Sequence, residues 1–382
     1  MKKVIAILGA TGSVGAQAID VARASGYRID FLSANKDVGS LEALAREFSP
    51  RAVAMADESS ALDLRTRLAD TDIRVYSGEE GIIRGISESS AETVVNSILG
   101  KAGLMPTLAT IESGKRLALA NKESLVIAGD IVMEAANKRS VEIIPVDSEH
   151  SAIFQSLSAG RRSEVKSIIL TASGGPFFGK TKEELRSVTL ADTLAHPTWK
   201  MGKKITVDSA TLMNKGFEII EAAHLFSLSP EMINVVVHRE SILHSAVEYI
   251  DNTVIGELSV PDMRACVQYA VDYPERRRAI IKPLNLFEIG TLSFMPPNEG
   301  AFPLLSLAKR ALSDRGGAGA VLNAADEVAV GAFLSGKISF AEISETVISV
   351  YEKMRSAAAS ANTLEELIAL DGEVRALTEK FI

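Results

Sequence analysis

The sequence predicts an α/β protein with an N-terminal parallel sheet, a central α+β region and a C-terminal helical bundle. In the first 146 residues, short β-branched apolar runs alternate with helical patterns, which is typical of a parallel sheet covered on both faces. Beyond residue 146 this alternation gives way to strand-rich segments and long loops. From residue 304 onward the apolar residues show only helical spacing, which indicates a small bundle.

Six strands are expected in the N-terminal part. The first follows a basic start, Met1-Lys2-Lys3, that mimics a signal peptide. Its apolar run breaks at Gly9 with no small-residue cleavage site, so we interpret it as a buried strand. The expected strands are Val4–Leu8, Ile29–Ser33, Ala52–Met55, Ile73–Tyr76, Thr93–Ile98 and Val141–Val146.

The central and C-terminal parts follow in order. After a strand at Val165–Ala172, the polar stretch 173–203 has the length and composition of a mobile lid and carries Trp199, the only tryptophan. Four proline residues then mark Ile281–Pro303 as a linker. The other expected elements are a helix at Ser209–Phe226, strands at Ile233–His238, Leu243–Tyr249 and Val254–Leu258, a helix from Asp262, and helices at Leu304–Leu312, Ala318–Leu334, Ser339–Met354 and Thr363–Thr378. The expected domains are residues 1–147, 148–282 and 304–382, with 283–303 as the linker.

Composition excludes several classes of protein. A net charge of −8, from 41 basic and 49 acidic residues, argues against nucleic acid as a partner. No apolar stretch approaches the roughly 20 residues of a membrane span, so we expect no membrane partner either. The single cysteine, Cys266, excludes an internal disulfide and a cysteine-based metal cluster, favours the reducing cytoplasm, and has the apolar neighbours of a core residue.

A glycine loop follows the first strand directly. Its sequence, Gly9-Ala10-Thr11-Gly12-Ser13-Val14-Gly15, leads into the helical pattern of residues 16–24. Glycines at such a turn let the backbone approach a pyrophosphate, and the free amides of a helix start favour the anion. The loop therefore predicts a Rossmann-like dinucleotide site, and the alternative is a tight turn that binds no nucleotide.

The residues after the second strand bear on the choice of dinucleotide. An acid about 20 residues past the last glycine usually binds the ribose of NAD, whereas a basic side chain suits the 2′-phosphate of NADP. Asn35 and Lys36 favour NADP here, while the neighbouring Asp37 leaves NAD open. An exposed lysine with no ligand is the third interpretation of Lys36.

Two carboxylates, Asp147 and Glu149, end the sixth strand. Residues two apart on an extended segment project to one side, so these carboxylates can converge at the carboxyl edge of the sheet. Hard oxygen ligands of this kind suit Mg²⁺ or Mn²⁺. The competing interpretation is that Asp147 only caps the next helix.

A second cluster lies near the expected helix start at Ser209. Asn214, Lys215 and Glu218 share one helix face, which could bind a phosphate and offer a carboxylate to a metal. An exposed Lys215–Glu218 pair is the alternative. Upstream, Ser173-Gly174-Gly175-Pro176 has amides suited to an anion, and His196 could donate to a substrate. The other four histidines show no metal-binding spacing.

Taken together, these motifs resemble the 1-deoxy-D-xylulose 5-phosphate reductoisomerase family. The resemblance covers nearly the whole chain in order, and the joint match of its two longest segments is far more specific than a glycine loop. The matching segments are Gly9–Gly15, Leu119–Ser124, Pro145–Gln155, Thr171–Phe177, His196–Gly202, Val207–Glu218, Pro261–Arg264 and Leu322–Ala325. Asp37, Lys200 and Arg239 depart from the family pattern.

The resemblance implies roles for individual residues. It implies an NADPH site at Thr11, Gly12, Ser13, Val14, Asn35, Lys36, Asn121, Glu123 and Gly202. It implies a divalent metal (Mg²⁺, Mn²⁺ or Co²⁺) on Asp147, Glu149 and Glu218, which with Lys122 and His196 form the catalytic set. Substrate contacts are implied at Lys122, Ser148, Glu149, His196 and Glu218, with Ser173, Ser209, Asn214 and Lys215 at the phosphate end and Trp199 covering the substrate from the flap 173–203.

The implied reaction has two steps, a skeletal rearrangement of the ketose phosphate and reduction of the resulting aldehyde by NADPH to 2-C-methyl-D-erythritol 4-phosphate. The implied assembly is a homodimer. Two rival functions are an ordinary NADP-dependent dehydrogenase of phosphorylated aldehydes, which would need a catalytic cysteine or a lysine/tyrosine proton donor, and a nucleotide-sensing protein without catalysis. Cys266 lies in no catalytic context, and the retained carboxylates argue against lost activity.

Overall fold

The computed structural model describes residues 3–199 and 201–382 and divides the chain into two compact units. The first comprises the residues up to Ser124, Val132–Ser151 and Asp262–Lys282. The second comprises Leu125–Ile131, Ala152–Pro261 and Pro283–Ile382. Within the described ranges, no helix has the length and apolar character needed to cross a membrane. Lys200 lies outside the described residues.

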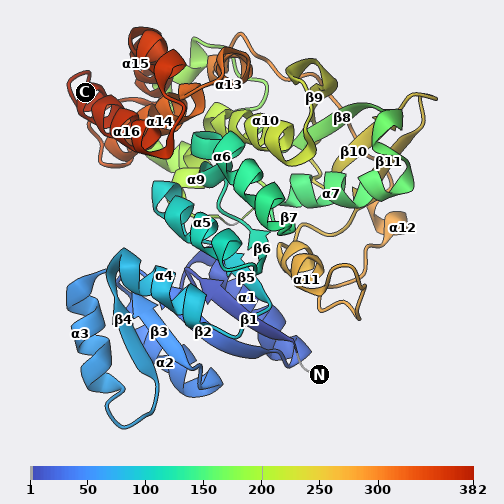
Figure 1. Cartoon of the computed structure of the whole chain (residues 1–382). Helices are drawn as coiled ribbons and strands as arrows, with labels where there is room; N and C mark the ends of the chain where they lie inside the picture. The colour runs from blue at the N-terminus through green and yellow to red at the C-terminus, as the bar shows by residue number, and fades with distance from the viewer. Residues whose placement is uncertain (1–2, 200) are drawn as a thin grey trace. The chain divides into compact units, whose positions relative to one another are not determined.

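The first unit contains a seven-stranded parallel sheet in the order β4-β3-β2-β1-β5-β6-β7 (Figure 1). All six expected strands are present, with ends within two residues of the prediction. Their bounds are β1 Val4–Leu8, β2 Arg28–Ala34, β3 Ala52–Met55, β4 Arg74–Ser77, β5 Thr93–Asn96 and β7 Ile143–Pro145. Most of their side chains are buried, as expected for a parallel sheet covered on both faces. The predicted fold class is confirmed.

One strand, β6 (Arg116–Leu119), is not among the strands that the sequence predicts. Its three apolar residues are leucine and alanine, which are helix formers and not β-branched. Pairing with β5 on one side and β7 on the other makes the segment a strand. The omission matters because β6 leads directly into Asn121, Lys122 and Glu123.

The first unit contains all or part of several helices, of which the first six link its strands. They are α1 Ser13–Ser25, α2 Val38–Phe48, α3 Glu58–Arg67, α4 Gly78–Glu88, α5 Leu104–Glu112, α6 Glu123–Arg139, the start of α7 Ser148–Ser156, and α11 Arg264–Asp272. Helix α11 joins this unit through Asp272, which is buried and accepts a hydrogen bond from the Tyr27 hydroxyl. Residues 262–282, which the sequence predicts as part of the central domain 148–282, belong to the first compact unit.

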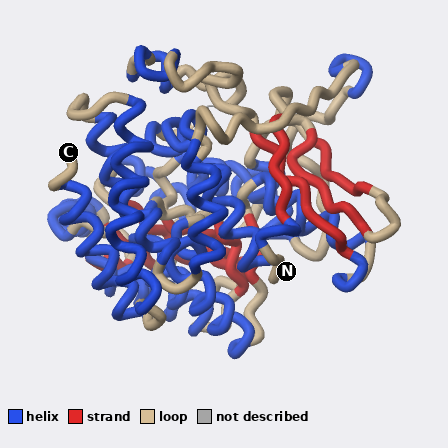
Figure 2. Tube along the Cα trace, turned by 90° about the horizontal axis from the view of Figure 1, so that it is seen from above, coloured by secondary structure: helices blue, strands red, loops and turns tan. Residues whose placement is uncertain are grey.

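The second unit contains a mixed four-stranded sheet in the order β11-β10-β8-β9. Figure 2 draws all strands red and all helices blue. The strands β8 Val165–Ala172, β9 Ile233–Val237, β10 Leu243–Tyr249 and β11 Val254–Leu258 match the expected ones. Strands β8 and β9 are parallel, and the long connection between them holds the segment 173–203 and the helices α8 Leu190–Leu194, α9 Lys203–Thr211 and α10 Met213–Phe226.

The expected single helix at Ser209–Phe226 is wrong. Helix α9 ends at Thr211 and α10 begins at Met213, because Leu212 between them adopts a left-handed conformation with φ 61°. No glycine or proline marks this break, so the local sequence carries no signal for it. Ser209 therefore lies in the last turn of α9, and the helix start near Asn214 and Lys215 belongs to α10.

The four helices predicted for the C-terminal bundle are present in the second unit. They are α13 Pro303–Asp314, α14 Ala318–Leu334, α15 Phe340–Ser360 and α16 Leu364–Glu379, and α14 packs against the other three. Helix α15, however, ends at Ser360 and not at the expected Met354. The linker before them carries the short helix α12 Leu286–Ile289 and pairs Met295 with Val237 at the end of β9.

Candidate active site

The glycine loop lies where the strand order of the first sheet reverses, between β1 and β5, which is where such sheets bind nucleotides. Gly9 has φ 73°, and a Cβ added there would lie 2.9 Å from the carbonyl oxygen of Ser97. A Cβ on Gly15 would lie 2.1 Å from the carbonyl oxygen of Gly9. Both positions therefore require glycine. Gly12 caps α1 with no side-chain hydrogen bond, and Thr11, Ser13 and Val14 line this turn.

After β2, the acidic residue Asp37 and the basic residue Lys36 have different surroundings. Asp37 caps α2 by accepting the backbone N–H of Ser40 at 3.0 Å. Hydrogen bonding from the Ser40 side chain and then from its backbone N–H lowers the pKa of the Asp37 carboxyl. Lys36 keeps 73% of its side chain exposed, with its Nζ 3.8 Å from an Asp57 carboxylate oxygen. Asp37 thus has a local structural task, and Lys36 extends into solvent beside Asn35.

Asn121 and Glu123 form a buried pair at the start of α6. The Asn121 amide nitrogen donates to the carbonyl oxygens of Ile98 and Gly100, at 2.8 and 2.9 Å, and to a Glu123 carboxylate oxygen at 2.8 Å. The Asn121 side-chain oxygen accepts the Ser124 backbone N–H. Asn121 therefore holds the loop after β5 with all of these contacts, so it shapes this edge of the sheet.

Lys122 and Asp147 pair at the same edge. The Lys122 ammonium donates to Asp147 Oδ2 at 3.2 Å, and both side chains are largely buried. Asp147 Oδ1 accepts the Glu149 backbone N–H at 3.3 Å, and the Ser148 hydroxyl donates to the Glu149 carboxylate. The expected extended geometry is wrong, since β7 ends at Pro145 and α7 begins at Ser148. Asp147 both caps this helix and faces Lys122, so the two interpretations of Asp147 are compatible.

Asn214, Lys215 and Glu218 share one face of α10, as their spacing predicts. The Asn214 amide donates to Glu218 Oε1 at 2.5 Å, and the Lys215 ammonium donates to Glu218 Oε2. The alternative of an exposed pair is wrong, because Lys215 and Glu218 are only 3% and 1% exposed. A buried ion pair of this kind contributes little net stability, because removing both ions from water costs about as much free energy as their attraction gains. Stability alone therefore does not explain the pair, which points to a functional role.

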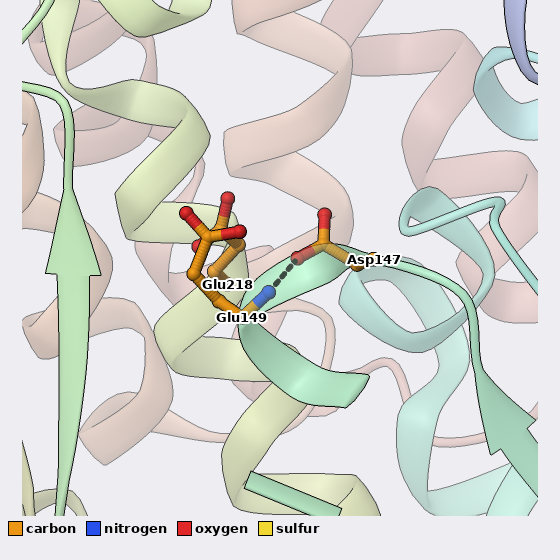
Figure 3. A group of neighbouring side chains, drawn as sticks. All are labelled: Asp147, Glu149 and Glu218. Carbon is orange, nitrogen blue, oxygen red and sulfur yellow. Dashed lines mark hydrogen bonds between the residues drawn. The ribbon is translucent and has the colours of Figure 1, made fainter. Parts of the chain in front are cut away.

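Three carboxylates gather into one cluster (Figure 3). One oxygen from each of Asp147, Glu149 and Glu218 lies within 4.8 Å of the others. Oxygen ligands bind Mg²⁺ at about 2.0–2.1 Å, so ligands on opposite sides of the ion are about 4.2 Å apart. Neighbouring ligands of such an octahedral ion are about 2.9 Å apart, so side-chain shifts of about 1–2 Å would bring the three oxygens into place around it. The donor set and the geometry therefore fit a hard divalent cation.

His196 joins two hydroxyls in the second unit. Its Nε2 lies 3.1 Å from the Ser173 Oγ and 3.2 Å from the Ser209 Oγ. Its Nδ1 accepts the backbone N–H groups of Thr198, at 3.2 Å, and Trp199, at 2.9 Å. Because Nδ1 is an acceptor, the neutral ring carries its proton on Nε2. Burial, followed by the charge of Arg239, lowers the pKa of His196, which keeps the ring neutral.

Arg239 organises the loop after β8 and was not among the expected site residues. Its guanidinium donates to the Gly175 carbonyl oxygen at 3.3 Å and lies over the Phe178 ring. No spacing in the sequence indicates this contact.

Two expected site residues lie at the end of the flap. The half-buried Trp199 has its ring centroid 6.1 Å from that of His244, and Gly202 is the N-cap of α9.

The fold and the site define a dinucleotide-dependent oxidoreductase that uses a divalent metal. Family models described as 1-deoxy-D-xylulose 5-phosphate reductoisomerase match residues 5–129, its C-terminal domain 143–226, and the DXP reductoisomerase C-terminal domain 258–377. The chain belongs to the 1-deoxy-D-xylulose 5-phosphate reductoisomerase family.

Full-length relatives support this assignment. The chain is 50% identical over 378 residues to the 1-deoxy-D-xylulose 5-phosphate reductoisomerase of Acetivibrio thermocellus, covering 99% of both chains. It is 49% identical over 378 residues to the enzyme of the same name from Caldanaerobacter subterraneus subsp. tengcongensis, covering 98% of both.

Solved structures agree. The Zymomonas mobilis 1-deoxy-D-xylulose 5-phosphate reductoisomerase in complex with NADPH superposes with a TM-score of 0.93 at 36% identity, over 100% of this chain and 99% of that one. A DOX-P reductoisomerase in complex with NADPH, fosmidomycin and magnesium gives a TM-score of 0.95 at 39% identity, over 99% and 98% of the two chains.

Proposed function

We propose an assignment of this chain's residues to the reaction of its family. The chain is an NADPH- and divalent-metal-dependent oxidoreductase that converts 1-deoxy-D-xylulose 5-phosphate to 2-C-methyl-D-erythritol 4-phosphate, in isoprenoid precursor biosynthesis. The observation that carries the assignment is the carboxylate cluster of Asp147, Glu149 and Glu218 in a chain that matches the family over its full length.

The cofactor is assigned to the first unit. Gly12, Ser13 and Val14, with Thr11, would bind the NADPH pyrophosphate through the loop and the start of α1. Lys36 and Asn35 would bind the 2′-phosphate end, which is supported by the exposed ammonium of Lys36 and by the separate capping role of Asp37. Asn121, Glu123 and Gly202 complete the proposed cofactor contacts. Bound NADPH supplies the hydride.

Replacing Lys36 by alanine is expected to narrow the preference for NADPH over NADH by about tenfold, the effect of losing roughly 1.5 kcal/mol of charge-assisted bonding. The check is kcat/KM for both cofactors in the parent and the variant. Lys138→Ala, which removes an exposed lysine at the end of α6, is the matched control and should leave the ratio unchanged. Equal use of NADH by the parent chain would contradict the assignment.

The metal is assigned to the three carboxylates, and Mg²⁺ and Mn²⁺ are the proposed ions. A divalent ion held there would act as a Lewis acid toward substrate oxygens. Lys122 would stabilise negative charge that develops on a substrate oxygen, because its ammonium already faces the Asp147 carboxylate. Ser148 orients Glu149 through their hydrogen bond.

The substrate's phosphate end is assigned to residues of the second unit. Ser173, Ser209 and the Nε2–H of His196 form one group of hydroxyl and imidazole donors. Asn214 and Lys215 add an amide and an ammonium in the first turn of α10. Trp199 would cover the substrate when the flap closes and excludes water.

A direct experiment tests the proposed function. NADPH oxidation is followed with 1-deoxy-D-xylulose 5-phosphate in the presence and absence of Mg²⁺ or Mn²⁺. Metal-dependent oxidation with formation of the erythritol phosphate is expected. An unchanged NADPH signal with every metal, in protein that melts cooperatively, would overturn the proposal.

The neutral state of His196 predicts a pH-dependent flap. Protonation would place a proton on Nδ1, which faces the two N–H groups of Thr198 and Trp199. Because the folded pKa lies below the ordinary value of 6.5, the stability contributed by neutral His196 is present above about pH 6.5 and is lost as the pH falls through the folded pKa. Fluorescence of Trp199, the only tryptophan, should therefore change below pH 6.5.

Two variants check this pH dependence. His196→Asn should abolish the fluorescence transition, since its amide does not titrate. His244→Asn is the control, because the His244 ring also lies near Trp199 but makes none of the described bonds to its backbone. If the fluorescence transition persists in His196→Asn and disappears in His244→Asn, His244 causes it and the prediction for His196 is wrong.

Assembly as a homodimer and location in the cytoplasm are further parts of the proposal. The linker and the edge strand β11 expose apolar side chains, among them Phe287, which is 100% exposed, Leu286 and Val254. Phe287→Asp is expected to shift the protein from dimer toward monomer, as measured by light scattering at several concentrations. A parent chain that is monomeric throughout would contradict the dimer. The single buried cysteine supports a reducing compartment.

A further inference from the structure

A cluster of three charged residues, of which the two aspartates are buried and the lysine is 29% exposed, joins α9 to α14. The Lys204 ammonium lies 2.6 Å from Asp208 Oδ2 and 2.9 Å from Asp326 Oδ2. Asp208 and Asp326 are almost completely buried, and burial raises the pKa of the Asp326 carboxyl. Burying ions costs several kcal/mol each, and apolar residues of similar volume often hold two helices better. Helix packing alone therefore does not account for this cluster.

The position of the cluster suggests its purpose. Lys204 lies in the first turn of α9, two residues after Gly202 at the end of the flap. Asp208 immediately precedes Ser209, whose hydroxyl contacts His196. The Lys204 ammonium also lies 4.9 Å from the centre of the Phe217 ring, and Phe217 precedes Glu218 in α10. The cluster thus touches both helices that carry the proposed substrate residues.

We propose that Lys204, Asp208 and Asp326 form a clamp that fixes α9 on α14 and thereby positions Ser209 and His196 for the substrate phosphate. Asp326 is in this view a positioning residue that acts through Lys204 and Asp208. The Lys204 ammonium binds a carboxylate on α9 and another on α14. Because charge-assisted hydrogen bonds are directional, they restrict the rotation of α9 about its axis more than apolar contacts do. The inference depends on the proposed role of Ser209 in substrate binding.

The test compares two replacements of Asp326. Asp326→Ala is expected to raise KM for 1-deoxy-D-xylulose 5-phosphate about tenfold while KM for NADPH stays unchanged, since a small displacement of binding groups weakens contacts this strongly. Asp326→Asn keeps the shape and one oxygen acceptor for Lys204, so KM should return to within about threefold of the parent value. If Asp326→Ala does not fold, Lys204→Met takes its place with the same expected result.

A matched control separates positioning from stability. Asp371 is fully buried in the same bundle, and its Oδ2 lies 2.8 Å from Arg375 Nε. The Arg375 guanidinium also donates to Glu327 of α14 and so connects α16 to α14. Asp371→Ala should lower the melting temperature about as much as Asp326→Ala but leave KM for the substrate unchanged. Equal rises in KM for both variants, or no rise in a folded Asp326→Ala, would overturn the clamp.

Ser209→Ala distinguishes the clamp from the function on which it rests. If Ser209→Ala raises KM for the substrate and Asp326→Ala does not, the clamp is wrong and the proposed substrate site stands. If Ser209→Ala leaves KM unchanged, the role of Ser209 fails, and with it the clamp as proposed here.

Discussion

Replacing Glu218 by glutamine is expected to lower turnover by on the order of 10²-fold or more, since even residues behind metal ligands cost about 10–100-fold in affinity or activity. Glutamine keeps the side-chain volume and removes one of the three charges that gather within 4.8 Å. Affinity for Mn²⁺ should fall with turnover. NADPH binding should survive, because the glycine loop is built from β1 and α1.

Thermal melts with and without Mn²⁺ provide a readout besides activity. The parent should gain melting temperature from the ion, and Glu218→Gln should gain much less. Glu221→Gln is the matched control, since Glu221 is also buried on α10 but lies outside the carboxylate cluster. An equal Mn²⁺-induced shift in parent and Glu218→Gln, with full activity retained, would remove Glu218 from the metal site.

The metal-free stability of Glu218→Gln shows how the structure changes an expectation. Three neighbouring carboxylates repel, so removing one should by itself stabilise the metal-free protein slightly. In the structure, however, Glu218 receives the Lys215 ammonium in a buried pair. Breaking such a pair costs roughly 3–5 kcal/mol, which exceeds the relief of repulsion. The metal-free variant is therefore expected to melt below the parent.

Lys215→Met is expected to weaken binding of the substrate and of fosmidomycin by about tenfold to a hundredfold, the range for losing one hydrogen bond from a charged group. NADPH affinity should stay nearly the same. Methionine has a similar length but no charge, so the variant should also melt at a lower temperature because Glu218 loses this partner. Calorimetric titration with fosmidomycin and with NADPH measures both affinities.

Asn214→Ala distinguishes an effect on phosphate binding from an effect on metal binding. It removes the neutral amide that donates to Glu218 Oε1 and leaves the Lys215–Glu218 pair in place. Fosmidomycin affinity should fall while the Mn²⁺-induced gain in melting temperature is largely retained. If NADPH affinity falls in these variants while fosmidomycin affinity is unchanged, the phosphate assignment is wrong.

Local sequence determined the bounds of many strands in both sheets and of one helix in the bundle. Strands β1, β3, β8, β10 and β11 and helix α14 have the bounds that apolar periodicity predicts. The glycine at position 15 is local too, because a Cβ there would lie 2.1 Å from the Gly9 carbonyl oxygen, whereas Gly9 itself packs against the distant Ser97. The grouping of Asn214, Lys215 and Glu218 follows from helical spacing alone.

Other features were decided only by tertiary structure. Strand β6 exists because β5 and β7 pair with a segment that has no strand propensity of its own. The break at Leu212 carries no glycine or proline signal, and it moves Ser209 from a helix start to a helix end. Residues 262–282 join the first unit through contacts of Asp272 with Tyr27 and Lys3, which are more than 240 residues away.

The chemistry of the site shows the same division. Residue types and spacing were enough to select the carboxylates, lysines and His196, since those side chains carry the charge and the donors that a phosphate and a metal require. Their burial and protonation were not accessible from sequence. The tautomer of His196 depends on two backbone N–H groups, and the cost of the Lys215–Glu218 pair depends on its exclusion from water. Both quantities depend on what surrounds a side chain in three dimensions, which a single sequence does not encode locally.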